Sequence, residues 1–285
     1  MPQLYILGSA IGFGLTPSLI QILLQQNYSA EVLAFFRFGL PALLCLPWLL
    51  SNQYKVAELL RTLLVGALSG IGMLCYYALF YYVPASTLIL CYYSYPLFSM
   101  LIAYLAFGSS LTRNRLICSF LILVAMYISL NAEPFSSLDY WQWVAVWLPP
   151  ISFAILINYF SNPVEPMKPK VRMAASLTGN VIVLLPFIVW LQPIKMLPTS
   201  GHEWLWVILL AGLSAAVPQY LFAKGSQSAG QEQTTLIGSS EIVFAMVFSH
   251  YFLNTPLTKN SILAALIIIA ASLIRLEKGK ASVSL

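Results

Sequence analysis

The sequence predicts an all-α membrane protein of ten transmembrane helices, arranged as two inverted five-helix repeats. Its composition, the spacing of its apolar segments and a weak internal similarity predict this fold. Of the 285 residues, 60% are hydrophobic and only 8% are charged, and the mean hydropathy is +0.83. A soluble domain carries about 25% charged residues. The composition therefore indicates a chain that crosses a membrane several times.

Ten apolar segments are candidates for membrane spans. A bilayer core about 30 Å thick needs roughly 20 apolar residues in a helix, and the fifth and tenth segments are shorter than this. Pro84 separates the third segment from the fourth, because proline cannot donate a backbone hydrogen bond inside a helix. The predicted spans are Leu4–Leu24, Val32–Leu50, Thr62–Tyr82, Ala85–Phe107, Leu116–Leu130, Trp141–Tyr159, Met173–Leu191, Trp204–Ala223, Thr234–Leu253 and Ile262–Leu276.

The lysines and arginines predict the orientation of these spans. If both termini are cytoplasmic, eleven of the 14 lysines and arginines lie in the inner loops or the C-terminal tail. Lys195 and Lys259 then lie outside, and Arg37 lies within a span. Because cytoplasmic loops carry an excess of lysine and arginine, we expect an inner-membrane or plasma-membrane protein with both termini in the cytoplasm. The same placement explains the net charge of +5 without a nucleic-acid partner.

An internal similarity divides the chain into two halves. Residues 94–114 and 240–260 share six identities without a gap when the chain is shifted by 146 residues. This predicts a first repeat over residues 1–131 and a second over residues 132–285. Each half has five predicted spans, and an odd number makes the second half enter the membrane upside down. Many secondary transporters have this arrangement.

Short motifs along nearly the whole chain resemble the EamA-type branch of the drug/metabolite transporter superfamily. They are "FFRF" around Arg37, "YVPASTLILCYYSYPLF", "FGSSLT", "EIVFAM" and "LNTPLT". The resemblance implies a carrier of small metabolites, such as amino acids and their derivatives, with a central cavity between the two halves. It also implies export as the common direction of transport.

Glu241 is the only formally charged residue within Thr234–Leu253. A charge at the centre of a membrane helix costs about 2.5–3.5 kcal/mol on insertion scales, so this side chain must face protein or water. Two roles are open: it binds an amine or another cationic group of the substrate, or it takes up and releases a proton. A structural role, as a buried ion pair or a hydrogen bond to a neighbouring helix, is the alternative. Arg37 is a candidate partner, although we expect it to act mainly as a structural anchor between helices.

Other polar and aromatic residues extend the candidate substrate site. Tyr95 occupies the position of Glu241 in the other repeat, and Tyr92 and Ser99 share its helical face. Gly238, one turn before Glu241, leaves room for a ligand or for the backbone of another helix. Tyrosine rings can bind a cation or an aromatic group. Further candidates for the cavity wall are Asn158, Gln219, Tyr76 and Tyr77. The alternative is a structural role, in hydrogen bonds between helices for the two amides and in packing for the two tyrosines.

Adjacent prolines in the sixth span, Pro149 and Pro150, are the preferred hinge, because each removes a helical hydrogen bond and can kink the helix. Static curvature is the alternative, since membrane helices tolerate proline well.

The leading function is a secondary transporter of a small polar metabolite, an amino acid or a related amine or aromatic compound, by alternating access and with export as the direction. An importer or facilitator of an organic cation or nucleoside-like metabolite is the alternative. An enzyme is not expected, because the chain has no GxSxG, HExxH or paired acidic motif. A non-transporting receptor is disfavoured because nearly all predicted loops are short.

No cofactor or metal is expected. The two histidines, His202 and His250, and four scattered cysteines without CxxC spacing do not form a zinc motif. The expected partners are the small-molecule substrate and the lipid bilayer, with a monomer or a homodimer as the functional unit.

Overall fold

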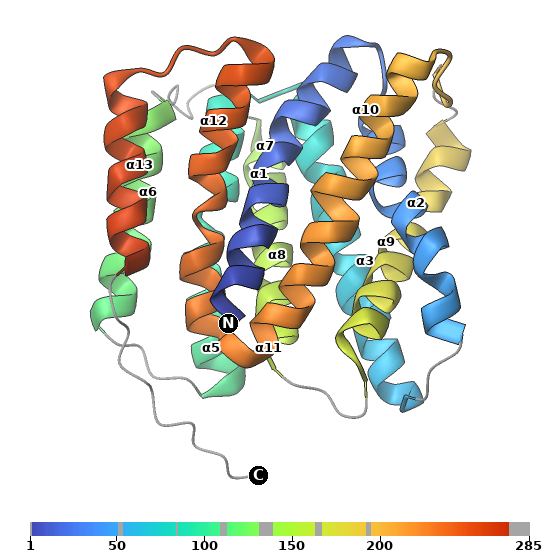
Figure 1. Ribbon diagram of the computed structural model, residues 1–285, viewed down its shortest axis with the longest axis horizontal. Coiled ribbons are helices and arrows are strands. Elements are labelled where there is room, and N and C mark those ends of the chain that lie inside the picture. Colours follow the sequence, from blue (N-terminus) through green and yellow to red (C-terminus); the bar gives the residue numbers. More distant parts are fainter. Residues whose placement is uncertain are drawn as a thin grey trace.

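The computed structural model describes residues 2–50, 54–83, 85–108, 113–130, 139–162, 167–191 and 195–273. Within these ranges all regular structure is helical, and the helices form one bundle (Figure 1). The helices are α1 (Pro2–Gln25), α2 (Ala30–Leu50), α3 (Val56–Leu79), α4 (Ala85–Tyr92), α5 (Tyr95–Phe107), α6 (Arg113–Leu130), α7 (Tyr140–Ala145), α8 (Leu148–Ser161), α9 (Pro169–Leu191), α10 (Gly201–Ala211), the π-helical turn η2 (Gly212–Ala216), α11 (Val217–Gly238), α12 (Glu241–Leu253) and α13 (Lys259–Leu273).

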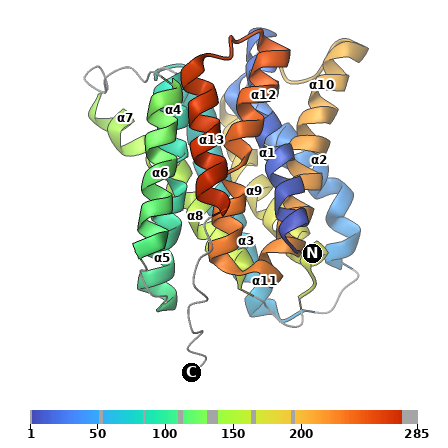
Figure 2. The ribbon, with the colours of Figure 1, turned by 60° about the vertical axis from the view of Figure 1, so that its left-hand side comes forward.

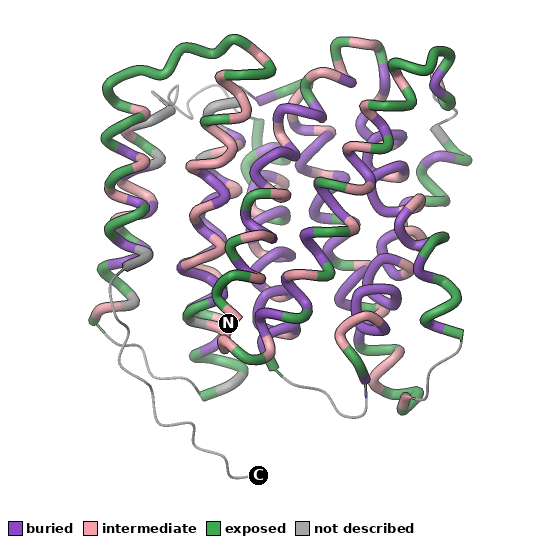
Figure 3. The backbone as a smooth tube through the Cα atoms, viewed as in Figure 1, coloured by how far each residue is buried: buried purple, intermediate pink, exposed green. Residues whose placement is uncertain are grey.

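The outer surface of the bundle suits a bilayer. Many large apolar side chains are exposed on it, including Leu44, Leu64 and Trp190, and the buried residues gather toward the middle of the bundle (Figure 3). A soluble monomer does not expose so much apolar surface. In the described part of the chain, seven helical segments are long and apolar enough to cross a membrane, and three shorter apolar helices accompany them. The chain is therefore a multi-pass membrane protein, and the number of ten spans stays a prediction.

Two predicted spans are interrupted at equivalent places. The fourth is divided at Tyr93–Ser94 and the ninth at Ser239–Ser240, which are 146 residues apart. In both interruptions a serine hydroxyl donates to the backbone carbonyl three residues earlier. The Ser94 hydroxyl donates to the Cys91 carbonyl at 2.5 Å, and the Ser240 hydroxyl donates to the Ile237 carbonyl at 2.7 Å. A serine hydroxyl that binds a nearby carbonyl competes with the regular helical bonds.

The backbone bonds around the two interruptions also match. The amide of Ser94 donates to Cys91 and that of Ser240 to Ile237, each at 3.1 Å and each across only three residues. The helices that follow, α5 and α12, are capped at their C-terminal ends by Gly108 and Asn254. Both residues have left-handed backbone angles, with φ of 61° and 54°, and they too are 146 residues apart.

The structure differs from the expected spans in two further places. The sixth span is two helices, α7 and α8, joined at Val146–Trp147. The connection expected between the eighth and ninth spans, residues 224–233, is mostly helical, because α11 continues to Gly238 and bends only at Gly230. Gly230 has φ 78° and ψ 167°, a conformation that a residue with a side chain rarely adopts.

Arg172 also lies in a different environment from the one expected. It is one of the eleven lysines and arginines expected in the inner loops or the C-terminal tail, but its side chain is fully buried in α9. It donates to the carbonyls of Tyr159 at 2.6 Å and Asn162 at 2.9 Å. These carbonyls lie at the C-terminal end of α8, where helical carbonyls lack intrahelical partners. Arg172 therefore links α9 to the end of α8.

Close helix contacts fix the positions of the central helices. α3 packs against α9 and α8, α1 packs against α11 and α12, and α6 lies beside α13 (Figures 1 and 2). A methyl group added at Gly66 of α3 would lie 2.1 Å from the carbonyl oxygen of Ser176 in α9. One added at Gly179 of α9 would lie 2.1 Å from the carbonyl oxygen of Leu63. The α3–α9 contact therefore depends on two glycines, as at many membrane helix interfaces.

Gly66 and Gly212 occupy equivalent positions in the two predicted repeats, and they provide a matched test of this contact. We expect Gly66→Ala to lower stability by about 1–3 kcal/mol, because α3 and α9 must move apart. Gly212→Ala should have little effect, since beyond the local helical backbone no atom lies within 4 Å of the added methyl group. Thermal unfolding of both variants in detergent measures the difference, and equal unfolding temperatures would contradict the close contact.

Candidate functional site

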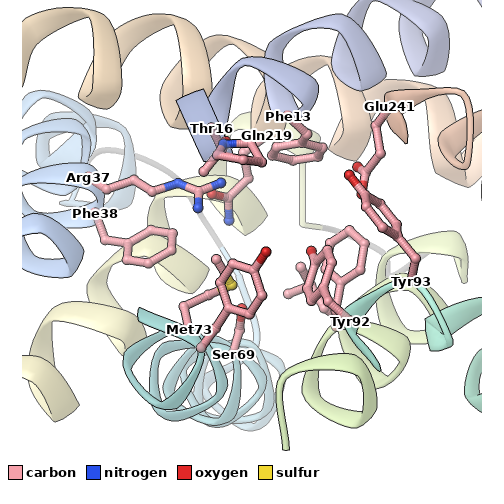
Figure 4. A pocket seen from close by; sticks show the side chains of 14 residues that line it. Phe13, Thr16, Arg37, Phe38, Ser69, Met73, Tyr92, Tyr93, Gln219 and Glu241 are labelled. Carbon is pink, nitrogen blue, oxygen red and sulfur yellow. The ribbon is translucent and has the colours of Figure 1, made fainter. Parts of the chain in front are cut away.

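A narrow cavity lies in the middle of the bundle, with α1, α2, α3, α4, α8, α11 and α12 around it (Figure 4). Its free volume is about 50 Å³, which is room for a few water molecules. Ligand pockets usually have about 300–1,000 Å³, so a metabolite could enter only after the helices or side chains move apart. The described residues that line it are Phe13, Thr16, Pro17, Arg37, Phe38, Ser69, Met73, Tyr76, Tyr92, Tyr93, Phe153, Leu156, Gln219 and Glu241.

Glu241 is the first residue of α12 and follows the interruption at Ser239–Ser240 directly. Its side chain is buried. An acidic residue in the first turn of a helix is favoured by the helix dipole. The close approach of α1 also shields it, because a methyl group on Gly14 would lie 2.7 Å from the backbone oxygen of Glu241. Among the described residues, no hydrogen bond or ion pair of its carboxyl group is found.

Arg37 lies on the other side of the cavity from Glu241 (Figure 4). Nη1 donates to the Tyr77 hydroxyl at 2.5 Å, and Nη2 donates to the carbonyl of Ser214 at 3.1 Å. In a regular helix that carbonyl would accept from residue 218, but Pro218 has no N–H. The guanidinium therefore supplies a donor that the sequence of α11 lacks. Arg37 and Glu241 form no direct ion pair.

Aromatic rings fill the space between the two charges. The Tyr76 and Tyr92 ring centroids are 5.0 Å apart, and Tyr92 stacks on Phe153 at 5.7 Å. Phe13 meets Phe153 edge to face at 6.1 Å. These rings come from α1, α3, α4 and α8, so they connect both halves of the chain. Ring faces attract cations, and the attraction is strongest where water is excluded.

Four residues expected at the site line the cavity: Glu241, Tyr92, Tyr76 and Gln219. Gln219 also donates to the Ser176 hydroxyl at 3.3 Å. Arg37, expected as a structural anchor, lines the cavity as well.

Two other expected residues lie in a buried polar network and not in the cavity wall. Asn158 of α8 donates to the Ser99 carbonyl at 2.9 Å and to the Ser99 hydroxyl at 3.0 Å. Gln231 also donates to the Ser99 hydroxyl, at 3.0 Å. The network joins α5, α8 and α11, so in this conformation both residues connect helices.

Tyr95, Gly238 and Tyr77 are also absent from the cavity wall. Tyr95 is buried and packs its ring against Phe153 at 4.8 Å. Its hydroxyl lies beside Gly238, 3.6 Å from where a methyl group would be. These residues lie behind the residues that line the cavity. Tyr77, for example, binds Arg37, which lines it.

Pro149 and Pro150 lie in the first turn of α8, just after the break at Val146–Trp147. Proline is well accommodated there, because the first N–H groups of a helix have no helical partner. The expected hinge motion stays a prediction.

Several lining residues were not predicted, although helical spacing could have identified them. Ser69, Met73 and Tyr76 are spaced by four and three residues along α3, and Phe13, Thr16 and Pro17 lie on one face of α1. Extending the face of each predicted residue by one turn would have found Met73. Tyr93 could not have been found in this way, because it lies in an interruption of the helix.

No metal centre is evident in the part of the chain that the structure describes. No three histidine, cysteine, aspartate or glutamate side chains lie close enough there to hold an ion. The four cysteines are unpaired thiols.

The anchoring role of Arg37 can be tested by Arg37→Lys, which keeps the positive charge but loses the planar guanidinium group and its several N–H donors. We expect a loss of about 1–3 kcal/mol of stability, because lysine cannot reach the Tyr77 hydroxyl and the Ser214 carbonyl together. Arg61→Lys is the matched control, since Arg61 forms an exposed pair with Glu58 at 2.7 Å and such pairs contribute little. Thermal unfolding measures both variants, and equal small losses would contradict the anchoring role.

Comparisons with known proteins agree with this architecture. The model of the EamA-like transporter family matches residues 1–131 and 142–276. The S-adenosylmethionine uptake transporter of Rickettsia bellii (strain RML369-C) is 25% identical over 264 residues, which cover 90% of this chain and 87% of that protein. A solved structure described as "Crystal structure of protein" has a TM-score of 0.66 at 15% identity, covers 93% of this chain and 94% of its own, and shows a similar fold. Because the family match covers most of the sequence, the chain belongs to the EamA-like transporter family and is a membrane transporter, not an enzyme.

Proposed function

We propose that this transporter carries a small metabolite with a positive charge close to an aromatic ring or an amino-acid group. The observation that carries the proposal is the cavity itself, where the unpartnered Glu241 carboxylate and the Arg37 guanidinium lie on opposite sides of a set of aromatic rings (Figure 4). A carboxylate attracts a cation, and the rings add a favourable face for it. A guanidinium is suited to a substrate carboxylate.

S-Adenosylmethionine is the first candidate for this substrate. The relative from Rickettsia bellii takes up this compound, which has a sulfonium cation, an adenine ring and an α-amino acid group. Glu241 would bind the cation, the tyrosines the adenine ring, and Arg37 the carboxylate. A simple amino acid or aromatic amine is the second candidate, since it has the same charges without the nucleoside.

Uptake is the direction that we propose, because the relative is an uptake transporter. Export, which the family resemblance favours, is the alternative. We also propose that Glu241 exchanges its bound substrate for a proton, since among the described residues it is the acidic side chain in the cavity wall.

The proposed architecture is two inverted repeats, residues 1–131 and 132–285, with ten spans and both termini in the cytoplasm. The matching interruptions at Tyr93–Ser94 and Ser239–Ser240 support it, and so do the two segments of the family match. In this arrangement the cavity lies between the repeats, where alternating access opens it to one side at a time. One chain then encloses a pathway, and a homodimer is not required.

Transport by the purified protein in liposomes tests the proposal. We expect uptake of labelled S-adenosylmethionine to fall by about tenfold or more in Glu241→Gln, because the variant loses a charge-assisted interaction. Glu58→Gln makes the same chemical change at the exposed pair with Arg61 and should transport normally.

Competition by unlabelled compounds identifies the substrate class. An aromatic amino acid, a quaternary amine and a nucleoside each carry one part of the expected chemistry. Counterflow measured in both directions distinguishes uptake from export. Normal transport by Glu241→Gln would refute the proposed role of this residue, whatever the substrate.

A further inference from the structure

A second cavity adjoins the central one. Its volume is about 300 Å³, several times that of the central cavity. It lies between α1 and α12 and reaches the connection between α12 and α13, where Thr255 and Leu257 line it. This connection lies at the end of the bundle opposite to the first residues of α1 (Figures 1 and 2). Its polar lining includes Gln21, Ser249 and Ser261.

Tyr93 and Pro17 separate the two cavities, since of the described lining residues only these two border both. Tyr93 belongs to the interruption between α4 and α5, and its side chain is buried. Figure 4 shows its ring extending toward the Glu241 carboxylate. Tyr93 therefore lies beside Glu241 and also borders the larger cavity.

We infer that the second cavity is an access vestibule to the central cavity, and that the side chain of Tyr93 is the gate between them. The inference concerns the route to the binding site proposed above. The substrate class is that of the proposed function: a cation leaving the vestibule passes the Tyr93 ring before it reaches Glu241, and a ring face favours cations over neutral compounds.

The two sides of the partition differ in how easily they can move. The ring of Pro17 is part of the α1 backbone and cannot rotate. Tyr93 can rotate about its side-chain bonds, and within the described residues no hydrogen bond holds its hydroxyl. The Tyr77 hydroxyl, in contrast, is bound by Arg37. Rotation of Tyr93 therefore breaks no polar contact.

The gate occurs in one repeat and not in the other. The residue 146 positions after Tyr93 is Ser239, a small side chain that is fully buried and donates to the Thr235 carbonyl at 2.8 Å. The equivalent interruptions therefore serve different purposes: one has a ring that can open a passage, and the other is fixed at the start of α12.

Cysteine modification measures the gate without any substrate. Ser69→Cys introduces a thiol of nearly the same size in the wall of the central cavity. The protein is reconstituted in liposomes and exposed to a small cationic, membrane-impermeant thiol reagent. We expect slow modification in Ser69→Cys alone and at least tenfold faster modification when Tyr93→Ala is added. Tyr93→Phe keeps the ring and should stay slow, and Tyr93→Leu repeats the test if the alanine variant does not fold.

Two controls make the result specific. Tyr251→Ala removes an exposed tyrosine of α12 and should not change the rate, and each variant without Ser69→Cys measures the reactivity of the native cysteines. Ser249→Cys in the vestibule should react at a similar rate with and without Tyr93→Ala. The inference is overturned if Tyr93→Ala leaves the rate at Ser69→Cys unchanged, if Tyr251→Ala raises it equally, or if Ser249→Cys is unreactive. None of these outcomes depends on transport, so they leave the proposed function to its own test.

Discussion

The burial of one carboxylate inside a membrane protein is the constraint on which the rest of the structure depends. Removing a carboxylate from water costs several kcal/mol unless the protein compensates it. Glu241 lies in the first turn of α12, where the helix dipole favours a negative charge. The Arg37 guanidinium across the cavity also favours the ionised form of Glu241. Its carboxylate is nevertheless unpartnered among the described residues. When this group is ionised its charge is only partly compensated, and a bound cation would complete the compensation.

A second constraint acts on the interrupted helices around the cavity. Backbone groups inside a membrane must be satisfied, and irregular backbone is tolerated only where protein or a cavity surrounds it. The hydroxyls of Ser94 and Ser240 bind carbonyls at the two interruptions. Arg37 binds the Ser214 carbonyl, which in a regular α-helix would accept from residue 218, a proline. A small number of polar side chains therefore both hold the helices together and shape the cavity. Short helical segments on either side of such turns can also shift separately. Such shifts would widen the central cavity, whose volume of about 50 Å³ is too small for a metabolite.

Much of this could be predicted from the sequence, because hydropathy and charge are properties of whole segments. The membrane fold and the transporter family are confirmed. Glu241 was identifiable because a charge in an apolar run is costly, and it lines the cavity. The shift of 146 residues was visible as identities, and it also relates the interruptions at Ser94 and Ser240.

The side-chain arrangement could not be predicted in the same way. Asn158 was a candidate for the cavity wall because of its polarity, and Ser99 because it shares a helical face with Tyr95. Neither property distinguishes a hydrogen bond between helices from a ligand contact. Tyr93 escaped prediction since a helical face ends where the helix is interrupted. The burial of Arg172 was unexpected because the sequence does not show that the end of α8 lies beside it.

The central claim is that Glu241 recognises a positive charge, and ligand affinity measures it most directly. Calorimetry of the wild-type protein should show tighter binding of S-adenosylmethionine than of its demethylated analogue, which has the same adenosine and amino-acid groups but a neutral sulfur. Glu241→Gln should bind the two compounds with similar affinity, because only the interaction with the cation is lost. An unchanged preference for the cation in that variant would contradict the account and place charge recognition elsewhere in the protein.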